Sequence, residues 1–202
     1  MSKLVLATRN IHKVGELRRI LAEAELDGID LVGVEAFPRM EDVVETGVTF
    51  AENAVLKARA VAAATGLASI ADDSGLCVDV LGGAPGVFSA RWCGRHGDDL
   101  ANLELLLAQL ADVSDAHRAA HFACAAVLVL PDGSERVVEA RMTGTLTHVP
   151  RGSNGFGYDP IFLPDGETRT TAEMTSAEKD AISHRGRAFR ALVPVLRDVL
   201  PG

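Results

Sequence analysis

Residues 3–24 read KLVLATRNIHKVGELRRILAEA, and this stretch decides the class of fold. Its first part, residues 3–7, is mostly apolar and typical of a buried strand. Apolar residues then recur at helical spacing with charged residues between them: Val14, Leu17, Ile20, Leu21 and Ala24. A second short strand is expected near residues 31–34. A buried strand that leads directly into an amphipathic helix predicts an α/β protein.

The strand signals change in character further along the chain. Two strands are predicted near residues 68–71 and 76–80. Residues 119–130 (AAHFACAAVLVL) and 134–142 (SERVVEARM) flank a Pro-Asp-Gly tripeptide at 131–133 and predict two strands joined by a tight turn. Strand pairs therefore dominate the middle of the chain, whereas strands and helices alternate near its start.

Capping residues indicate where the helices begin and end. Thr49 and Glu52 form a capping box that begins an Ala-rich helix, and Gly66 is expected to end this helix after about Thr65. Asp98 or Asp99 is expected to cap a further helix that runs to about Leu110. Thr175 and Glu178 form a second candidate capping box. The last helix is predicted from about His184 to Val199, and Pro194 is expected to kink or split it.

Together these elements predict one domain over residues 1–202 with a mixed α/β sheet and a smaller second lobe. A substrate cleft is then expected between the two lobes. The length agrees, because 202 residues fit a single domain. The composition, 48% hydrophobic and 24% charged, is that of a chain that can bury a sizeable core.

Charge and hydropathy argue against several classes of partner. The net charge is −8 without a Lys/Arg block, whereas duplex nucleic acid requires a clustered basic surface. The longest apolar stretch, residues 122–130, is less than half of the roughly 20 residues that a membrane span needs. The N-terminal apolar run is too short for a signal peptide. Cys77, Cys93 and Cys124 form no C-x-x-C pair, and their odd number fits a reducing compartment. We therefore expect a cytoplasmic protein that binds neither nucleic acid nor membrane.

Thr8, Asn10 and Lys13 lie at the junction of the first strand and the first helix. Ligands bind at the carboxyl ends of strands in open α/β sheets, and a helix N-terminus favours anions. Thr8 and Asn10 offer hydrogen bonds and Lys13 a positive charge, which suit a phosphate. An ordinary helix cap at Asn10 with a solvated Lys13 would explain the same residues. The chain has neither a G-x-x-x-x-G-K-[ST] nor a G-x-G-x-x-G motif, which excludes ordinary P-loop and Rossmann sites.

Carboxylates form a second group of candidate residues. Asp72 and Asp73 follow an apolar run and are expected at a strand end before a turn, and Glu45 is a further acid. Adjacent residues of an extended chain point to opposite faces, so only one of the two aspartates is expected to face a given site. Hard oxygen ligands together with a phosphate substrate indicate Mg²⁺. Asp-Asp-Ser-Gly is also ordinary turn chemistry.

Residues 152–160 (GSNGFGYDP) place glycines on both sides of one phenylalanine, Phe156. Glycines allow the backbone to approach a ligand closely, and a ring can then cover it. A base stacked on such a ring gains about 1–3 kcal/mol in single-strand binders. A Gly-rich turn with a phenylalanine in the core is the structural alternative.

Lys179 and Ser183-His184-Arg185 place donors near the start of the last helix. The rigid fork of an arginine suits a phosphate or the carbonyl-bearing edge of a base. A histidine at such a position is also compatible with a surface or core role.

The order and spacing of these motifs resemble one family over residues 3 to about 198. The shared motifs are Thr-x-Asn-x-x-Lys at 8–13, ETGVTFAENA at 45–54 with Lys57, ADDSGL at 71–76, GGAPGVFSAR at 82–91, GFGYDP at 155–160 and AISHRG at 181–186. The chain is thereby similar to the inosine triphosphate pyrophosphatase family, also called non-canonical purine NTP or dITP/XTP diphosphatases.

This resemblance implies a mixed α/β fold with an elongated central sheet and two lobes that flank a substrate cleft. It also implies a homodimer that requires Mg²⁺ and cleaves ITP, dITP and XTP between the α and β phosphates. The products would be the nucleoside monophosphate and pyrophosphate, so that deaminated purines are kept out of nucleic acid.

The resemblance also assigns roles by position. Thr8, Asn10 and Lys13 would hold the triphosphate, with Ser74 nearby. Glu45 and Asp73 would bind the metal, and Asp73 would also be the base that activates water. The base pocket would be lined by Phe156, stacked on the purine, and by Gly157, Tyr158, Asp159, Lys179, His184 and Arg185. Arg9 and His12 stand where many members have glycine, so their roles, like that of Asp72, stay open.

Base selection follows from hydrogen-bond chemistry. Hypoxanthine and xanthine carry a carbonyl at position six, where adenine carries an amino group. Donors from Arg185, His184 or backbone amides would pair with the carbonyl and would be left unpaired by adenine. Guanine shares the carbonyl, so its exclusion must depend on its two-amino group.

Two other functions are compatible with these residues. One is a diphosphatase that prefers another damaged or pyrimidine triphosphate, and the other is a non-catalytic nucleotide sensor. Retention of both Glu45 and Asp73 argues against the sensor, because binding phosphate alone does not require a base.

Overall fold

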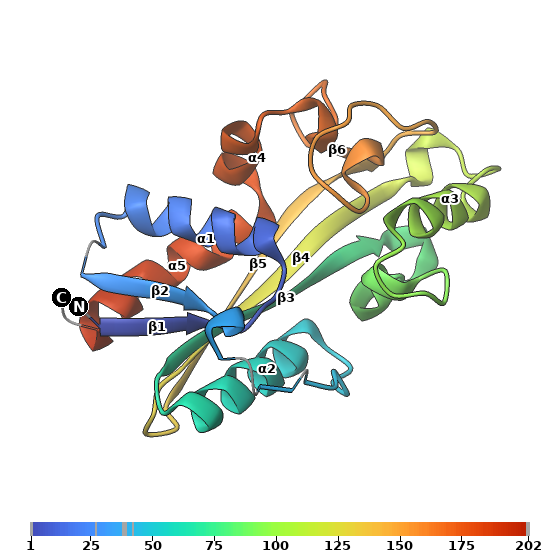
Figure 1. Cartoon of the computed structure of the whole chain (residues 1–202). Helices are drawn as coiled ribbons and strands as arrows, with labels where there is room; N and C mark the ends of the chain where they lie inside the picture. The colour runs from blue at the N-terminus through green and yellow to red at the C-terminus, as the bar shows by residue number, and fades with distance from the viewer. Residues whose placement is uncertain (1, 27, 38–39, 42, 201–202) are drawn as a thin grey trace. The chain divides into compact units, whose positions relative to one another are not determined.

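The computed structural model describes residues 2–26, 28–37, 40–41 and 43–200. Within these residues, one sheet has the strand order β2-β1-β3-β4-β5-β6 (Figure 1). Its strands are β1 (Ser2–Leu6), β2 (Ile29–Gly33), β3 (Ala68–Val78), β4 (Ala119–Val129), β5 (Glu135–Leu146) and β6 (Phe162–Pro164). The helices are α1 (Ile11–Glu23), α2 (Phe50–Thr65), α3 (Asp99–Gln109), α4 (Ser176–Ile182) and α5 (His184–Val199). β1 pairs in parallel with β2 and β3 whereas β5 and β6 are antiparallel, so the predicted mixed α/β sheet is confirmed.

The chain divides into two compact units. Unit 1 comprises Met1–Asp73, Cys124–Ala140 and Arg185–Gly202, and unit 2 comprises Ser74–Ala123 and Arg141–His184. The expected cleft between two lobes of a single domain stays a prediction.

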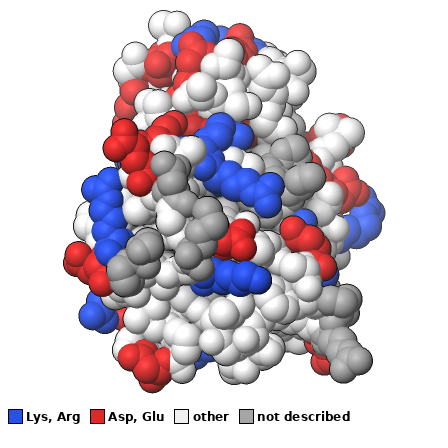
Figure 2. Space-filling view, turned by 60° about the vertical axis from the view of Figure 1, so that its left-hand side comes forward, with Lys and Arg blue, Asp and Glu red and all other residues white. Residues whose placement is uncertain are grey.

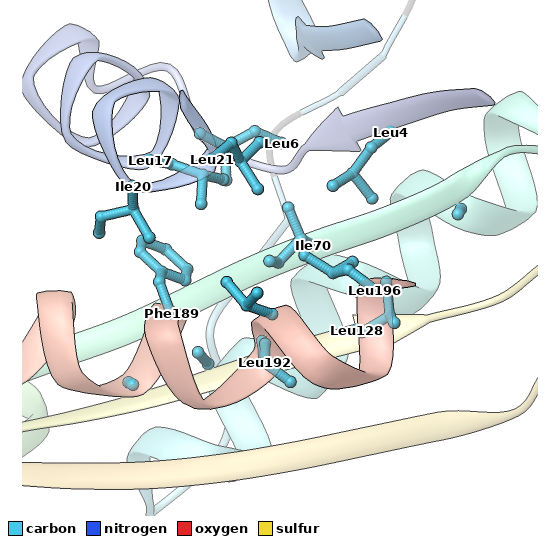
Figure 3. Close-up of a cluster of buried hydrophobic side chains, with 14 of the residues drawn as sticks. Leu4, Leu6, Leu17, Ile20, Leu21, Ile70, Leu128, Phe189, Leu192 and Leu196 are labelled. Atoms are coloured by element: carbon cyan, nitrogen blue, oxygen red, sulfur yellow. The ribbon is translucent and has the colours of Figure 1, made fainter. Parts of the chain in front are cut away.

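The core of unit 1 consists of two apolar clusters, one on each face of the sheet. Side chains alternate between the two faces of a strand, and in β1 Leu4 and Leu6 join one apolar cluster while Val5 joins another. The first cluster is closed by α1 and α5, as shown by Leu17, Ile20, Phe189 and Leu192 beside Ile70 in Figure 3. The second is closed by α2. Unit 1 is therefore a sheet covered by helices on both faces.

Helix α2 begins and ends where local sequence signals predict. The Thr49 hydroxyl accepts a hydrogen bond from the Glu52 amide at 3.2 Å, and Glu52 Oε2 accepts one from the Thr49 amide at 3.1 Å. Gly66 ends the helix with a φ of 66°, a left-handed conformation that glycine adopts without strain. The predicted capping box and stop are confirmed.

β3 corrects one expectation. Two strands separated by a turn at Asp72-Asp73-Ser74-Gly75 were expected, but a single strand runs from Ala68 to Val78. Both aspartates are buried inside it. Their carboxylates bind cationic side chains of other elements, and this satisfies polar groups that would otherwise favour a turn.

Unit 2 has its own apolar cluster, in which α3 packs with residues of β3, β4 and β5. Arg118 is 1% exposed beside this cluster. It donates to the carbonyls of Leu146 at 2.8 Å, Leu110 at 2.8 Å and Thr147 at 3.0 Å. A buried arginine is tolerated here because several backbone acceptors satisfy its donors.

The remaining predicted elements are mostly confirmed. Asp98 caps α3, and β4 and β5 flank the predicted turn, with β5 extending to Leu146. The capping box of Thr175 and Glu178 begins α4. α5 runs through Pro194 as one helix, so of the two expected effects of this proline, a kink or a split, the split does not occur. Pro194 is exposed, so its ring does not disturb the packed face.

Two surface properties bear on the expected partners. No helix among the described residues is long and apolar enough to cross a membrane. On the face drawn in Figure 2, acidic and basic side chains are interspersed with one another. The absence of a nucleic-acid partner stays a prediction.

Candidate functional site

Lys57 brings together the two predicted metal ligands in unit 1. Its Nζ lies 2.8 Å from Glu45 Oε1 and 3.3 Å from Asp73 Oδ1. Asn53, one turn earlier on α2, donates from Nδ2 to Asp73 Oδ2 at 3.1 Å. We call Glu45, Asn53, Lys57 and Asp73 the carboxylate cluster. Both oxygens of Asp73 thus have a donor from the same face of α2.

Charges inside the carboxylate cluster perturb one another. Burial raises the pKa of Asp73 above its ordinary value, and the nearby Glu45 adds to this effect while Lys57 opposes it. Burial alone would lower the pKa of Lys57, but Asp73, Asp72 and Glu45 raise it above its ordinary value. Asp73 is therefore a stronger proton acceptor than an exposed aspartate, while Lys57 stays charged.

Asp72 is the centre of a second group in unit 1. Its Oδ2 accepts from Lys13 Nζ at 2.8 Å and from Arg185 Nε at 3.1 Å, and Arg185 Nη1 donates to Glu16 Oε2 at 2.9 Å. We call Lys13, Glu16, Asp72 and Arg185 the Asp72 cluster. Burial would raise the pKa of Asp72, but Lys13 and Arg185 hold this pKa well below its ordinary value. Two cations and two carboxylates make the cluster formally neutral.

The two adjacent aspartates face different partners, as the alternation of side chains along a strand predicts. Asp72 points to the side of α1 and α5, where Ile70 also packs. Asp73 points to α2, where Ala71 also packs. Lys13 thus binds Asp72, whereas Asp73 belongs to the carboxylate cluster.

The other phosphate-binding candidates lie around the end of β1. The Thr8 hydroxyl accepts a hydrogen bond from the Asn10 amide at 3.1 Å, just before α1 begins. Arg9 donates from Nη2 to the Met40 carbonyl at 2.9 Å. The side chain of His12 lies outside the part of the chain that the structure describes. Ser74 follows Asp73 in β3 and belongs to unit 2. Phosphate binding by these residues stays a prediction.

The predicted base-binding loop forms a compact group in unit 2. Asp159, 2% exposed, accepts from the Phe156 amide at 2.8 Å and from the Thr171 hydroxyl at 2.9 Å. Lys179 Nζ also donates to Asp159 and lies 5.0 Å from the centroid of the Phe156 ring. We call Phe156, Asp159, Thr171 and Lys179 the Asp159 cluster. It fixes the backbone of the loop, and the Lys179 ammonium lies over the Phe156 ring.

Glycine is required within this loop. Gly155 has a φ of 76°, and a Cβ there would lie 2.1 Å from Asp159 Oδ2. The Gly157 amide donates to Asp99 Oδ2 at 2.8 Å. Tyr158 is buried and its hydroxyl donates to the Ser89 carbonyl at 2.9 Å, so this side chain anchors the loop in unit 2.

His184 and Arg185 are neighbours in sequence but have different surroundings. His184 is buried in unit 2, where its ring stacks on Phe122 with centroids 4.9 Å apart and planes 9° apart. Arg185 belongs to unit 1 and the Asp72 cluster. Their predicted contacts with a base stay predictions.

The structure thus brings the predicted residues into separate groups. In unit 1, Glu45 and Asp73 both bind Lys57. Also in unit 1, Lys13 and Arg185 both bind Asp72. In unit 2, Lys179 binds Asp159 and lies over the ring of Phe156. Sequence reasoning gave no role to four residues that complete these groups: Glu16, Asn53, Lys57 and Thr171. Helical spacing was an available signal for Glu16, three residues after Lys13, and for the pair Asn53 and Lys57.

The structure thus defines an α/β protein with cation-bound carboxylates buried in one unit and a glycine-flanked aromatic ring in the other. Residues 4–195 match the Ham1 family, and the chain belongs to this family.

Named relatives and solved structures agree with this assignment. The chain is 70% identical over 200 residues to the dITP/XTP pyrophosphatase of Streptomyces avermitilis, covering 99% of this chain and 100% of the relative. It is 54% identical over 202 residues to that of Mycobacterium tuberculosis, covering 100% and 98%. A Ham1 protein structure from Coxiella burnetii superposes with a TM-score of 0.88 at 40% identity, covering 98% of this chain and 100% of that one. The dITP/XTP pyrophosphatase structure from Mycobacterium abscessus gives 0.78 at 55% identity, covering 96% and 100%.

Proposed function

We propose that this protein hydrolyses the non-canonical purine nucleoside triphosphates ITP, dITP and XTP to the monophosphate and pyrophosphate, and that it uses Mg²⁺. The observation that carries the proposal is the convergence of Glu45 and Asp73 on Lys57. Full-length similarity to relatives named dITP/XTP pyrophosphatase supports the substrate class.

The carboxylate cluster fits Mg²⁺ by the chemistry of its donors. Glu45 and Asp73 supply hard oxygens that already meet at one cation, the ammonium of Lys57. Among the described residues, no three His, Cys, Asp or Glu side chains gather at a metal site. Mg²⁺ commonly takes one or two carboxylates together with substrate phosphates and water. When bound, the ion would offset phosphate charge and polarise the phosphoryl group.

Asp73, Lys57 and Lys13 would each have a separate role at the metal site. Asp73 would accept a proton from the attacking water. Lys57 would keep Glu45 and Asp73 oriented, since it binds both. An ammonium has three donors, so Lys13 can retain its bond to Asp72 while it binds a phosphate oxygen. A triphosphate carries about four negative charges, which these cations and Mg²⁺ would together offset.

The Asp159 cluster would hold the purine. The ring of Phe156 would stack on the base, with Lys179 at its side. The resemblance also assigns Arg185 to reading the carbonyl at position six, and Asp72 and Glu16 hold its guanidinium within unit 1. Adenine offers a donor instead of an acceptor at position six, which disfavours ATP.

Pyrophosphate release from ITP, XTP, dITP, ATP, GTP and CTP, measured with and without Mg²⁺, tests the proposal. We expect Mg²⁺-dependent turnover of the first three substrates and little of the others. Equal turnover of all six would retain the metal chemistry and overturn base selection. No release from any substrate would favour the nucleotide sensor instead.

Two further expectations belong to the proposal. The resemblance implies a homodimer, which analytical ultracentrifugation would detect as twice the mass of one chain. The cytoplasmic location predicted from cysteine usage and the N-terminal sequence is tested by fractionating the cells that make the protein.

A further inference from the structure

Asn53 links two parts of the carboxylate cluster, although neither the sequence motifs nor the proposed chemistry gives it a role. It lies in α2 and is 0% exposed. Its Nδ2 donates to Asp73 Oδ2 at 3.1 Å, and its Oδ1 accepts from the Gly47 amide at 2.8 Å. Asn53 thus joins the candidate base to a segment of chain two residues from Glu45.

These two hydrogen bonds fix the orientation of the amide. The Gly47 amide can only donate, so the side-chain atom facing it must be the oxygen. The NH₂ group is then directed at Asp73, where a carboxylate accepts it. A residue with two acceptors or two apolar ends cannot make both bonds, so this position requires the asymmetry of an asparagine.

Gly47 has a matching requirement for a small residue. A Cβ at Gly47 would lie 2.7 Å from Asn53 Oδ1 and 2.6 Å from Glu52 Cβ. Real Cβ atoms do not approach other atoms so closely, and α2 itself lies directly beneath, with Asn53 N at 3.0 Å. The absent side chain at Gly47 therefore allows the segment carrying Glu45 to lie against Asn53.

The Asp73 carboxylate and the segment that carries Glu45 are consequently connected by two routes. Lys57 binds both directly. Asn53 connects Asp73 to the backbone at Gly47. A phosphate that binds Lys57, or a metal that displaces Lys57 from the carboxylates, would leave the second route intact, because Asn53 binds Asp73 through the other oxygen.

We propose that Asn53 is a positioning residue that holds the Asp73 carboxylate in orientation and in register with Glu45. The inference rests on the proposed function for its effect on turnover. Groups that orient metal-binding side chains from behind typically change metal affinity or activity by about 10- to 100-fold when removed.

The test compares Asn53→Ala with Asn102→Ala. Asn102 is also buried and its Oδ1 accepts from a backbone amide, that of Cys93 at 2.7 Å, so it controls for the loss of a buried amide. Turnover of ITP is measured over a range of Mg²⁺ concentrations. We expect Asn53→Ala to raise the half-saturating Mg²⁺ concentration and lower kcat by about 10- to 100-fold each, with little change in KM for ITP at saturating Mg²⁺.

A second readout does not depend on turnover. The rise in melting temperature caused by MgCl₂ with inorganic pyrophosphate is expected to shrink in Asn53→Ala and to persist in Asn102→Ala. A crystal structure of Asn53→Ala is expected to show the Asp73 carboxylate rotated from its position in the wild type. An unrotated carboxylate, or Mg²⁺ dependence equal to that of Asn102→Ala, overturns the inference.

Gly47→Ala provides an independent variant if Asn53→Ala does not fold. It disturbs the same link from the other side, so we expect the same rise in the required Mg²⁺ concentration. Normal Mg²⁺ dependence in Gly47→Ala would contradict the inference. Failure of the proposed function gives a different pattern, in which the wild type itself releases no pyrophosphate; the crystal structure of the variant then decides the positioning role alone.

Discussion

The Asp72 cluster and the Asp159 cluster both centre on a buried aspartate that binds a lysine, but they are assembled differently. In the Asp72 cluster, Lys13 and Asp72 are 59 residues apart, and Arg185 is 113 residues from Asp72. In the Asp159 cluster, the partners of Asp159 are 3, 12 and 20 residues away. The first cluster therefore exists only when unit 1 is folded, whereas the second is built within one segment of unit 2.

This difference separates two kinds of residue. Long-range buried ion pairs tie the stability of unit 1 to its site, because removing one partner leaves another charge buried without compensation. Short-range contacts set the shape of a loop and affect what it binds. Substitutions in the Asp72 cluster and in the Asp159 cluster should therefore differ in their effects on stability and on substrate binding.

Asp73→Asn and Asp159→Asn are expected to differ in kinetic character. Loss of the base at Asp73 should lower kcat by about 100- to 10 000-fold with nucleotide binding retained. Loss of the charge at Asp159 should mainly raise KM for ITP, because Lys179 and the Phe156 amide lose their common acceptor. Steady-state kinetics and equilibrium binding of ITP separate these outcomes.

Glu104→Gln, an exposed change on α3, is the control and should behave as the wild type. If the protein were a nucleotide sensor, Asp73→Asn would retain its function. If the protein is an enzyme, an unchanged kcat in Asp73→Asn would exclude Asp73 as the base.

Asp72→Asn is expected to destabilise the protein by about 3–5 kcal/mol, because the partly buried Lys13 and the buried Arg185 would lose their shared carboxylate. Asp159→Asn should destabilise it less, since only one cation is involved and Thr171 retains a partner. Urea denaturation of both variants gives the comparison. Equal losses of unfolding free energy would contradict the larger contribution assigned to the Asp72 cluster.

The contribution of Asp72 should also depend on pH in a defined direction. Its pKa in the folded protein is lowered, so the stabilisation is complete above the unfolded pKa of about 3.9 and is lost as the pH falls towards the folded pKa. The difference in unfolding free energy between wild type and Asp72→Asn should therefore be constant from neutral pH to about pH 5 and shrink below about pH 4. A difference that grows on acidification would contradict the ion-pair assignment.

The smallest expected effect concerns features that the two units share. Thr49 caps α2 in unit 1 and Thr175 caps α4 in unit 2 with the same capping box. Thr49→Ala and Thr175→Ala should each lower the unfolding free energy by about 1 kcal/mol, as measured by urea denaturation. A much larger loss for Thr49→Ala would indicate that this cap also supports the adjacent carboxylate cluster.

Features encoded within a few residues could be predicted from the sequence. The helix α2, its capping box and its stop at Gly66 depend only on neighbouring residues, and the structure has all three. The hairpin of β4 and β5 likewise follows from two apolar runs around one turn. The mixed sheet followed from the order of such elements.

Features that depend on distant partners could not be predicted in the same way. The sequence Asp-Asp-Ser-Gly favours a turn locally, but Lys13, Lys57 and Arg185 bind the two aspartates and keep β3 continuous. Glu16 accepts a hydrogen bond from Arg185, which lies 169 residues away in the sequence. Asn53 stood within a recognised motif, yet its role depends on the approach of Gly47, which only the fold provides.

Arg118 links the unfolding of three segments of unit 2. One guanidinium binds carbonyls at the end of α3 and at the end of β5, and the Arg118 amide group itself belongs to the segment that enters β4. None of these segments can detach alone without stranding a charged, buried group. The C-terminal turn of α3 and the last amides of β5 should accordingly exchange their hydrogens with deuterium at one common slow rate, as a single cooperative unit.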